Sequence, residues 1–367
     1  MKIGIVGLPN VGKSTLFNAL TKSYAADAAN FPFCTIEPNV GIVNVKDPRI
    51  EKLAEISKTQ NLIYATIKFV DIAGLVRGAS EGQGLGNKFL SHIREVDAIL
   101  QVTRHFEDGD ISHVEGSIDP IRDIEIIQTE LMLSDLEQLE KTLDGYAKKA
   151  KSGDKEAIKL TEIINVVVAG LRQWKLVIDC LEDFSAEDKK LLQGYQLLTN
   201  KPFIYAVNVA QSELGKAPAI QKEFAEKLKK PVGIVCAHFE SEMIEFSADE
   251  RKEYLSELGH AQHLDHIPTL DDLIAVAFDT VGLMYYFTTW EKETRAWTIP
   301  KWSTAPQAAG AIHTDFEKWF IKAEVIAYED FVADGWWAAG KEKGHVKLEW
   351  KEYIVKDWDI MLFRFNN

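Results

Sequence analysis

The first twenty residues constrain the fold of this chain more than any other segment. Lys2–Val6 predicts a short buried strand, and Gly7-Leu-Pro-Asn-Val-Gly12-Lys13-Ser14-Thr15 leads from it into the apolar helical start Leu16–Leu20. The spacing G-x-x-x-x-G-K-[S/T] between a strand and a helix is typical of a phosphate-binding loop. The alternative is an accidental glycine-rich turn. That alternative does not explain why a strand, the motif spacing and a helix occur together. We therefore predict an α/β nucleotide-binding domain.

The residues of this loop have separate expected roles. Backbone N–H groups should bind phosphate oxygens at the positive end of the following helix. The residues expected to bind nucleotide are Asn10, Val11, Gly12, Lys13, Ser14 and Thr15. Lys13 should reach the β- and γ-phosphates and take part in catalysis, and the Ser14 hydroxyl should ligate Mg²⁺.

A second motif narrows the class of phosphate-loop protein. Phe69-Val-Asp71-Ile-Ala-Gly74 is an apolar strand that ends in Asp and Gly. In switch nucleotidases such an Asp holds Mg²⁺ through water, and such a glycine N–H meets the γ-phosphate. Thr35, in the loop before the second strand, is the candidate threonine that closes over Mg²⁺. An ordinary strand-to-turn junction is the alternative for Asp71 and Gly74.

Length and composition set the outer bounds. The chain has 367 residues, enough for two or three domains, and a net charge of −14 that argues against broad nucleic-acid coating, so no DNA partner is expected. Cys34, Cys180 and Cys236 lack metal-binding spacing and are expected to be reduced thiols of a cytoplasmic protein. No apolar run approaches a membrane span, and the chain begins with its first strand, so neither a membrane nor a signal peptide is expected.

The order of the predicted elements indicates three parts. Strands expected at Lys2–Val6, Val40–Val45, Ile67–Val70 and Ala98–Thr103 alternate with helical stretches, as in a mostly parallel sheet. From 124 to 150 and from 160 to 174 apolar residues repeat every three and four positions, which predicts an antiparallel helical hairpin. Strands resume at Pro202–Val207 and Val232–Cys236, so the hairpin is an insertion.

The last part is a compact α+β module. Its expected strands are Met284–Thr289, Arg295–Ile299, Ala323–Ala327 and Ile360–Phe365, and a short helix over Ala305–Ile312 is capped by Thr304. We thus predict a nucleotide-binding domain over 1–120 and 198–280, a helical domain over 121–197, and the C-terminal module over 281–367.

The motifs resemble those of the Obg-like P-loop proteins, and most closely those of the YchF group. The stretches that carry the resemblance are Gly7–Thr15, Asn30–Gly41, Asp71–Ala79, Glu81–Leu90, Arg295–Pro300, Thr304–Ala309, Ile312–Phe316 and Ala323–Tyr328. The resemblance spans essentially the whole chain. It implies a P-loop G domain with an inserted helical hairpin, a C-terminal β-grasp module of the TGS type, and an ATP-hydrolysing switch.

Base recognition departs from the guanine-specific pattern Asn-Lys-x-Asp. The matching stretch is Asn208-Val209-Ala210-Gln211, so the lysine and the aspartate are absent. A neutral carboxamide cannot make the charge-assisted bonds of a carboxylate to guanine, which are worth about 1.5–3 kcal/mol each. It offers instead one donor and one acceptor, which suits the N1 acceptor and N6 donor of adenine. The YchF group resembles this in preferring ATP, although it usually carries Glu at position 211. Glu213 is the fallback partner, and Cys236-Ala237 stands where the superfamily contacts the base through its backbone.

The glutamine that usually orients the attacking water is absent from the motif. Switch GTPases often place Gln after Asp-x-x-Gly, where this chain has Leu75, so slow turnover is expected. The resemblance implies His113 as a catalytic residue; a solvated loop histidine is the alternative.

The expected partners follow from the same reading. Lysines 148, 149, 151, 155 and 159 around the hairpin tip predict either a solvated helix end or a contact to ribosomal RNA. We expect an ATP-hydrolysing switch associated with ribosomes. One alternative is a GTPase of the same fold, and the other is a ribosome-binding module in which nucleotide only sets the conformation.

The tryptophans are unevenly placed. Eight of nine lie from Trp290 onward, several in turn-like contexts such as Trp302 and Trp358. In YchF-like proteins many comparable turn positions hold glycine, and tryptophan adopts positive φ only at a cost. Either those turns are rebuilt, or the module is strained, or the sequence carries a systematic substitution; base stacking is a weaker fourth reading.

Overall fold

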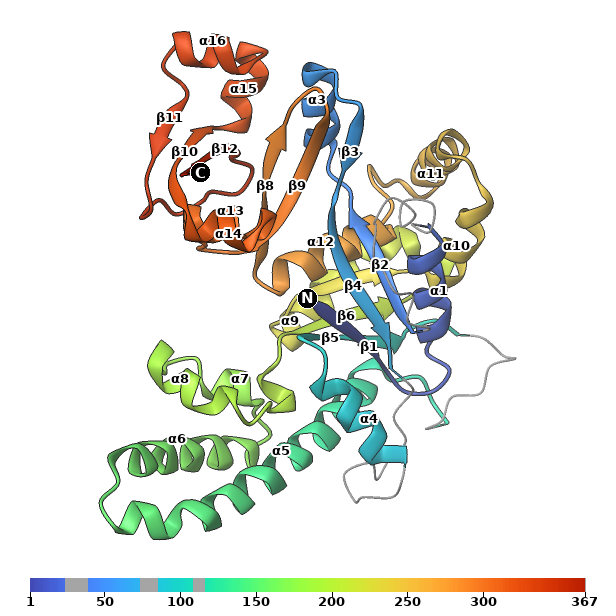
Figure 1. Ribbon diagram of the computed structural model, residues 1–367. Helices are drawn as coiled ribbons and strands as arrows, with labels where there is room; N and C mark the ends of the chain where they lie inside the picture. The colour runs from blue at the N-terminus through green and yellow to red at the C-terminus, as the bar shows by residue number, and fades with distance from the viewer. Residues whose placement is uncertain (24–38, 73–84, 108–115, 367) are drawn as a thin grey trace. The chain divides into compact units, whose positions relative to one another are not determined.

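The computed structural model describes residues 1–23, 39–72, 85–107 and 116–366 (Figure 1). Thr35, Gly74, Leu75 and His113 lie outside these residues. The chain divides into two compact units, one of residues 1–41 and 68–276 and the other of residues 42–67 and 277–367. In the described part, no helix is long and apolar enough to cross a membrane.

The first sheet has six strands in the order β2-β4-β1-β5-β6-β7. They are β2 (Val40–Val45), β4 (Ala65–Asp71), β1 (Lys2–Val6), β5 (Ala98–Arg104), β6 (Phe203–Asn208) and β7 (Val232–Val235). The pairs β1–β4, β1–β5, β5–β6 and β6–β7 are parallel. β5 and β6 are buried along their whole length, as apolar runs in a parallel sheet must be. The six strands predicted for this sheet all occur, with bounds that differ by at most two residues.

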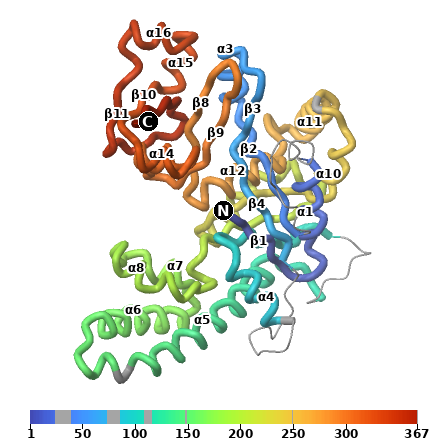
Figure 2. Tube along the Cα trace, viewed as in Figure 1, coloured from blue at the N-terminus to red at the C-terminus, as the bar shows by residue number. Residues whose placement is uncertain are grey.

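Helices flank this sheet and form the insertion (Figure 2). They are α1 (Lys13–Ser23), α4 (Leu85–Arg94), α5 (Pro120–Lys151), α6 (Lys155–Leu171), α7 (Val177–Cys180), α8 (Ala186–Gln193), α9 (Ala217–Leu228), α10 (Ala237–Glu242), α11 (Ala248–Gln262) and α12 (Leu270–Thr280), with short 3₁₀ turns η2 (Leu198–Asn200), η3 (Gln211–Lys216) and η4 (Met243–Glu245).

The insertion contains the two predicted helices. α5 and α6 pack side by side, and Asp154 caps α6 by accepting the Ala157 N–H at 3.0 Å (Figure 1). The fully buried Asp135 of α5 accepts N–H bonds from Leu198 and Thr199 at 2.8 Å each, which ties α5 to η2. The predicted apolar repeat is wrong at its last position: Trp174 follows the end of α6 and is 65% exposed.

The second unit is built on a sheet of order β11-β10-β12-β8-β9-β3. Its elements are α3 (Pro48–Ser57), β3 (Asn61–Ile63), β8 (Leu283–Thr289), β9 (Glu293–Pro300), α13 (Ala305–Ile312), α14 (Thr314–Lys318), β10 (Phe320–Ile326), α15 (Tyr328–Asp334), α16 (Trp337–Glu342), β11 (Lys347–Glu349) and β12 (Ile360–Phe365). Its core includes Tyr286, Ile299, Ala323 and Phe363.

Part of this unit comes from early in the chain. β3 pairs in parallel with β9, with Asn61 opposite Glu293, and the Ser57 hydroxyl lies 2.7 Å from that of Thr289. No local pattern in the sequence indicates this pairing, and the domain boundaries predicted above include residues 42–67 in the nucleotide-binding domain. They group with the C-terminal module because their strand completes its sheet.

Candidate functional site

The loop between β1 and α1 has the backbone that a phosphate cradle requires. Asn10 and Gly12 have positive φ values of 64° and 95°. A Cβ on Gly12 would lie 2.3 Å from Nδ2 of Asn208, and one on Gly7 would lie 2.6 Å from the Val102 carbonyl oxygen. Both glycines are therefore needed for close approach, and Gly12 also for its conformation.

Lys13 lies just inside this loop. Its Nζ donates to the Leu8 carbonyl oxygen at 2.7 Å, and the side chain is 9% exposed. Burial lowers the pKa of Lys13 to about 8, opposed by the nearby Asp71 carboxylate. The ammonium thus bonds a neutral backbone carbonyl. Charged phosphate oxygens would be a stronger partner for it than this carbonyl.

Ser14 and Asp71 lie beside it and have the chemistry of a magnesium site. The Ser14 hydroxyl hydrogen-bonds the Asp71 carboxylate, which is half-buried. Burial raises the pKa of Asp71, and Lys13 and Ser14 oppose the shift. Hydroxyl and carboxylate oxygens are the ligands that Mg²⁺ prefers, so these residues fit the ion. No cluster of three His, Cys, Asp or Glu residues suited to a metal occurs in the described ranges.

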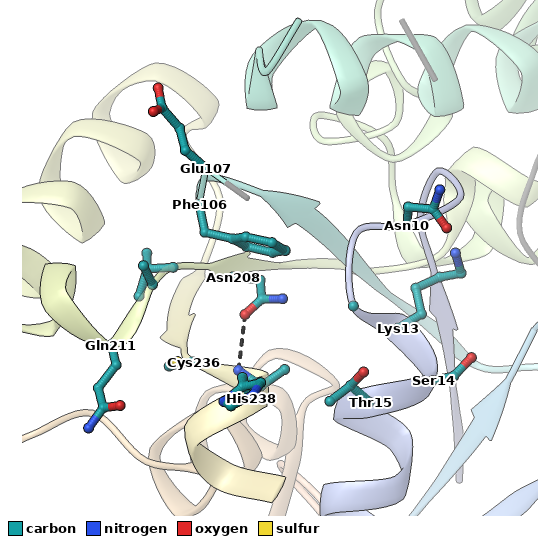
Figure 3. Close-up of a pocket in the computed structure, with 14 residues that line it drawn as sticks. Asn10, Lys13, Ser14, Thr15, Phe106, Glu107, Asn208, Gln211, Cys236 and His238 are labelled. Carbon is teal, nitrogen blue, oxygen red and sulfur yellow. Dashed lines mark hydrogen bonds between the residues drawn. The ribbon is translucent and has the colours of Figure 1, made fainter. Parts of the chain in front are cut away.

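Asn208, at the end of β6, connects the loop to the next strand. Its Nδ2 donates to the Val11 carbonyl oxygen at 3.0 Å, and its Oδ1 accepts the Ala237 N–H at 3.0 Å (Figure 3). The side chain is 4% exposed. Asn208 was predicted to face a base; here both of its amide atoms are taken by backbone groups, so it holds the two sides of the cavity together.

A cavity of about 690 Å³ opens between these segments. Ten of the residues predicted to bind nucleotide line it: Asn10, Gly12, Lys13, Ser14, Thr15, Asn208, Val209, Gln211, Cys236 and Ala237. Val11 is fully buried and lies outside the lining. Phe106, Glu107, Ala210 and His238 also line the cavity and were not predicted.

Phe106 is the most informative of these additions. It follows the end of β5, and the buried Arg104 donates to its carbonyl oxygen at 3.1 Å, with the guanidinium 4.6 Å from the ring centre. The adjacent His105 N–H donates to the Asn208 carbonyl oxygen at 2.9 Å. The position of Phe106 after a predicted strand could have indicated it, because the carboxyl ends of parallel strands lie at one edge of a sheet, where ligands bind.

The base-recognition candidates differ in how they are engaged. Gln211 lines the cavity and its Nε2 donates to the Tyr254 hydroxyl at 3.3 Å. Glu213 accepts the Ala210 N–H at 3.3 Å and lies 3.4 Å from Nδ1 of His105, outside the cavity lining. Cys236 is buried, which raises the pKa of its thiol. Gln211 is thus better placed for a ligand than Glu213.

Comparisons with known proteins agree with this geometry. Residues 2–136 match the family described as 50S ribosome-binding GTPase, and residues 283–366 match the YchF-GTPase C-terminal family, described as a protein of unknown function. The ribosome-binding ATPase YchF of Bacillus subtilis is 47% identical over 99% of this chain and 98% of its own length. This chain belongs to the YchF family.

Two further relatives support membership of the YchF family. The ribosome-binding ATPase YchF of Escherichia coli O157:H7 is 48% identical over the whole of this chain and 99% of its own length. The solved structure of the Schizosaccharomyces pombe YchF GTPase is 38% identical, covers 99% of this chain and 97% of its own, and has a TM-score of 0.87. The YchF family therefore accounts for both units.

Proposed function

We propose that this chain is a Mg²⁺-dependent nucleoside triphosphatase that prefers ATP and acts on the ribosome in the cytoplasm. The observation that carries the proposal is the cavity in which Gly12, the buried Lys13 and Asn208 meet. Relatives of near 48% identity are named ribosome-binding ATPases, which supports the same assignment.

The chain's own residues supply positioning and charge. Backbone N–H groups of residues 10–15 and the Lys13 ammonium bind the phosphates, and the loop's strained backbone is fixed before the nucleotide arrives. Mg²⁺ would be held by Ser14 and Thr35, with Asp71 through water, and when bound it neutralises charge on the phosphate oxygens. Gly74 would meet the γ-phosphate through its N–H.

The preference for ATP rests on Val209 and Gln211. No lysine lies along the base and no carboxylate is available at 211 to accept from guanine, while a carboxamide suits the donor and acceptor edge of adenine. A GTPase of the same fold is the second candidate, and the Schizosaccharomyces pombe relative is named a GTPase. Competition of ATP and GTP against a fluorescent nucleotide separates the two; tighter binding of GTP overturns the ATP preference.

Hydrolysis should be slow without a partner. Leu75 cannot orient water, so we expect single turnover well below the ~1 s⁻¹ lower end typical of enzymes. His113→Ala should lower kcat about 10–100-fold with little change in ATP affinity, if that imidazole positions the water. Single-turnover hydrolysis at saturating Mg²⁺-ATP measures the rate, and an unchanged rate removes His113 from the mechanism.

The ribosome is contacted, in this proposal, by the tip of the helical insertion. Lys149, Lys151, Lys155 and Lys159 are exposed there, and Lys159 lies 3.4 Å from Asp188. A module in which nucleotide only sets the conformation remains the third candidate. Cosedimentation with ribosomes in ADP and in a non-hydrolysable ATP analogue, together with a hydrolysis-dead variant, separates it from the switch. We further assign the C-terminal module to the TGS type of β-grasp fold, and we propose the three domains with the boundaries predicted above, except that residues 42–67 group with the second unit.

A further inference from the structure

Helix α11 holds the base end of the cavity at two points. The Tyr254 hydroxyl accepts from Nε2 of Gln211 at 3.3 Å, and Nε2 of Gln262 donates to the Gln211 carbonyl oxygen at 3.3 Å. Gln211 is the first residue of η3 and lines the cavity. Neither Tyr254 nor Gln262 was implicated by the sequence, because α11 begins 37 positions further on in the chain than η3 does.

The Tyr254 ring is held by two aromatic neighbours. It stacks on Phe239 with 5.9 Å between ring centres and meets Phe246 at the same distance with a tilt. Phe239 is 1% exposed, so this side of the ring rests on the core. The hydroxyl therefore has a fixed place beside Gln211.

In this contact Nε2 of Gln211 donates to the Tyr254 hydroxyl, and the bond restrains the amide beside the cavity. With Nε2 donating to Tyr254, the amide oxygen remains as an acceptor and lies on the side of the amide nearer His238 (Figure 3). An acceptor attracts the exocyclic amino group of a 6-aminopurine and repels the 6-oxo group of guanine or hypoxanthine. We propose that Tyr254 is a positioning residue that selects a 6-amino over a 6-oxo purine through Gln211, a role that rests on the ATP preference proposed above.

The test compares ATP with inosine triphosphate, which differs at the 6 position and lacks the guanine 2-amino group. Tyr254→Phe keeps the ring and removes the hydroxyl, so it should lower the ratio of ATP to inosine triphosphate affinity about threefold to tenfold. Tyr64→Phe is the matched control, because it also removes a tyrosine hydroxyl, one that donates to the Glu51 carboxylate at 2.7 Å outside the cavity lining; its ratio should stay that of the wild type. Thermal unfolding of both variants checks that each is folded.

The outcomes separate the two claims. An unchanged ratio in Tyr254→Phe, with a wild type that prefers ATP, overturns the role of Tyr254 and leaves the proposed function in place. A wild type that binds the two nucleotides equally overturns the ATP preference and this role with it.

A separate observation concerns three tryptophans. Within the described ranges, eight residues other than glycine have positive φ; five are polar or charged, and the others are Trp174, Trp302 and Trp358, at 61°, 70° and 70°. This conformation is uncommon for bulky side chains and is glycine's natural region. Trp302 is 82% exposed and Trp174 is 65% exposed, so burial does not offset the strain.

We infer that positions 174, 302 and 358 are glycine positions of this fold. A codon that is read as tryptophan in one genetic code and as glycine in another would account for the exchange at all three positions. The tryptophans of the turns then form no stacking surface for RNA, and the exposed turns at 174 and 302 gain rather than lose stability by their removal.

Two measurements test the glycine assignment. Trp302→Gly should raise Tm by about 2–8 °C, whereas Trp302→Ala, which keeps a Cβ in the same strained backbone, should gain less than half as much. Equal Tm values for the two variants overturn it. The mass of the peptide spanning residue 302, taken from the protein made in its own cell, should be that of glycine, and a tryptophan mass overturns it as well.

Discussion

The phosphate end and the base end of the cavity are built in different ways. The phosphate end comes from one continuous segment, residues 7–15, whose glycines and lysine are specified by local sequence. The base end joins β6, β7 and α11 through side chains, and its central bond connects Asn208 to Val11, 197 residues away. Local changes at the phosphate end should therefore affect binding alone, while changes at the base end should affect stability and selectivity together.

Lys13→Ala is expected to have the largest effect on binding. The ammonium would make charge-assisted bonds to two phosphates, so its loss should weaken ATP affinity about 100–1000-fold. Tm should change little, because the bond from the Lys13 ammonium to the Leu8 carbonyl oxygen does little more than offset the cost of burying that charge. Isothermal titration and thermal unfolding measure the two quantities.

The matched control is Lys201→Ala. Lys201 is also partly buried and donates to the carbonyl oxygens of Arg94 and Val96, away from the cavity. It should lower Tm and leave ATP affinity unchanged. Affinity of Lys13→Ala within threefold of the wild type would mean that the loop does not bind phosphate as proposed.

Asn208→Ala should remove the two hydrogen bonds that connect the walls of the cavity at its base end. It leaves the Val11 carbonyl and the Ala237 N–H buried without partners, at about 1–3 kcal/mol each, so the free energy of unfolding should fall by about 2–6 kcal/mol. ATP affinity should fall about 10–100-fold as the two walls separate. Denaturant unfolding and nucleotide titration check this.

Gln101→Ala is the control for Asn208. Gln101 is 1% exposed on the neighbouring strand β5, and its Nε2 donates to the Ile124 carbonyl oxygen at 3.2 Å. It should destabilise the fold without lowering affinity. If Asn208→Ala destabilises the protein and binds ATP with the affinity of the wild type, the bonds of Asn208 to Val11 and Ala237 stabilise the fold and play no part in nucleotide binding.

The same contrast explains what the sequence could predict. The bounds of β1, β2, α13 and β12 agree with the predicted ones, because each is a local apolar pattern with a clear start and stop. β3 was missed because it has three half-exposed or exposed residues, and its partner β9 lies more than 200 residues away.

In the site, the phosphate loop and part of the walls agree with the predicted residues, whereas the wall residues Phe106, Glu107, Ala210 and His238 were not predicted. Phe106 follows a strand that was predicted, but its place beside Asn208 depends on the β5–β6 pairing, which no local pattern indicates. The motif predicts Asn208 as a base contact, because a sequence motif identifies a residue but does not show which groups it bonds. The bonds appear only when Val11 and Ala237 are brought together.

Lys13 should also give the phosphate end a pH dependence. Its pKa in the free protein is lowered to about 8, chiefly by burial, and phosphate binding needs the ammonium form. ATP affinity should therefore be full below pH 8 and fall as pH rises through it, about tenfold between pH 7 and 9. Binding should take up a proton near pH 8, which titration in buffers of different ionisation enthalpy detects. A flat profile would contradict a functional role for the ammonium.

Gln211→Asp has the smallest expected effect and tests the base end most directly. A carboxylate would accept from guanine N1–H and the 2-amino group, so the ratio of GTP to ATP affinity should rise, by less than about tenfold because Val209 supplies no lysine along the base. The variant also loses the amide that donates to Tyr254, which should weaken ATP binding slightly. Glu213→Gln is the matched control: Glu213 is held by Ala210 and lies outside the cavity lining, so its change should leave the ratio where it is. A shifted ratio in Glu213→Gln with an unchanged one in Gln211→Asp would move base recognition to Glu213, and would mean that η3 rearranges when nucleotide binds.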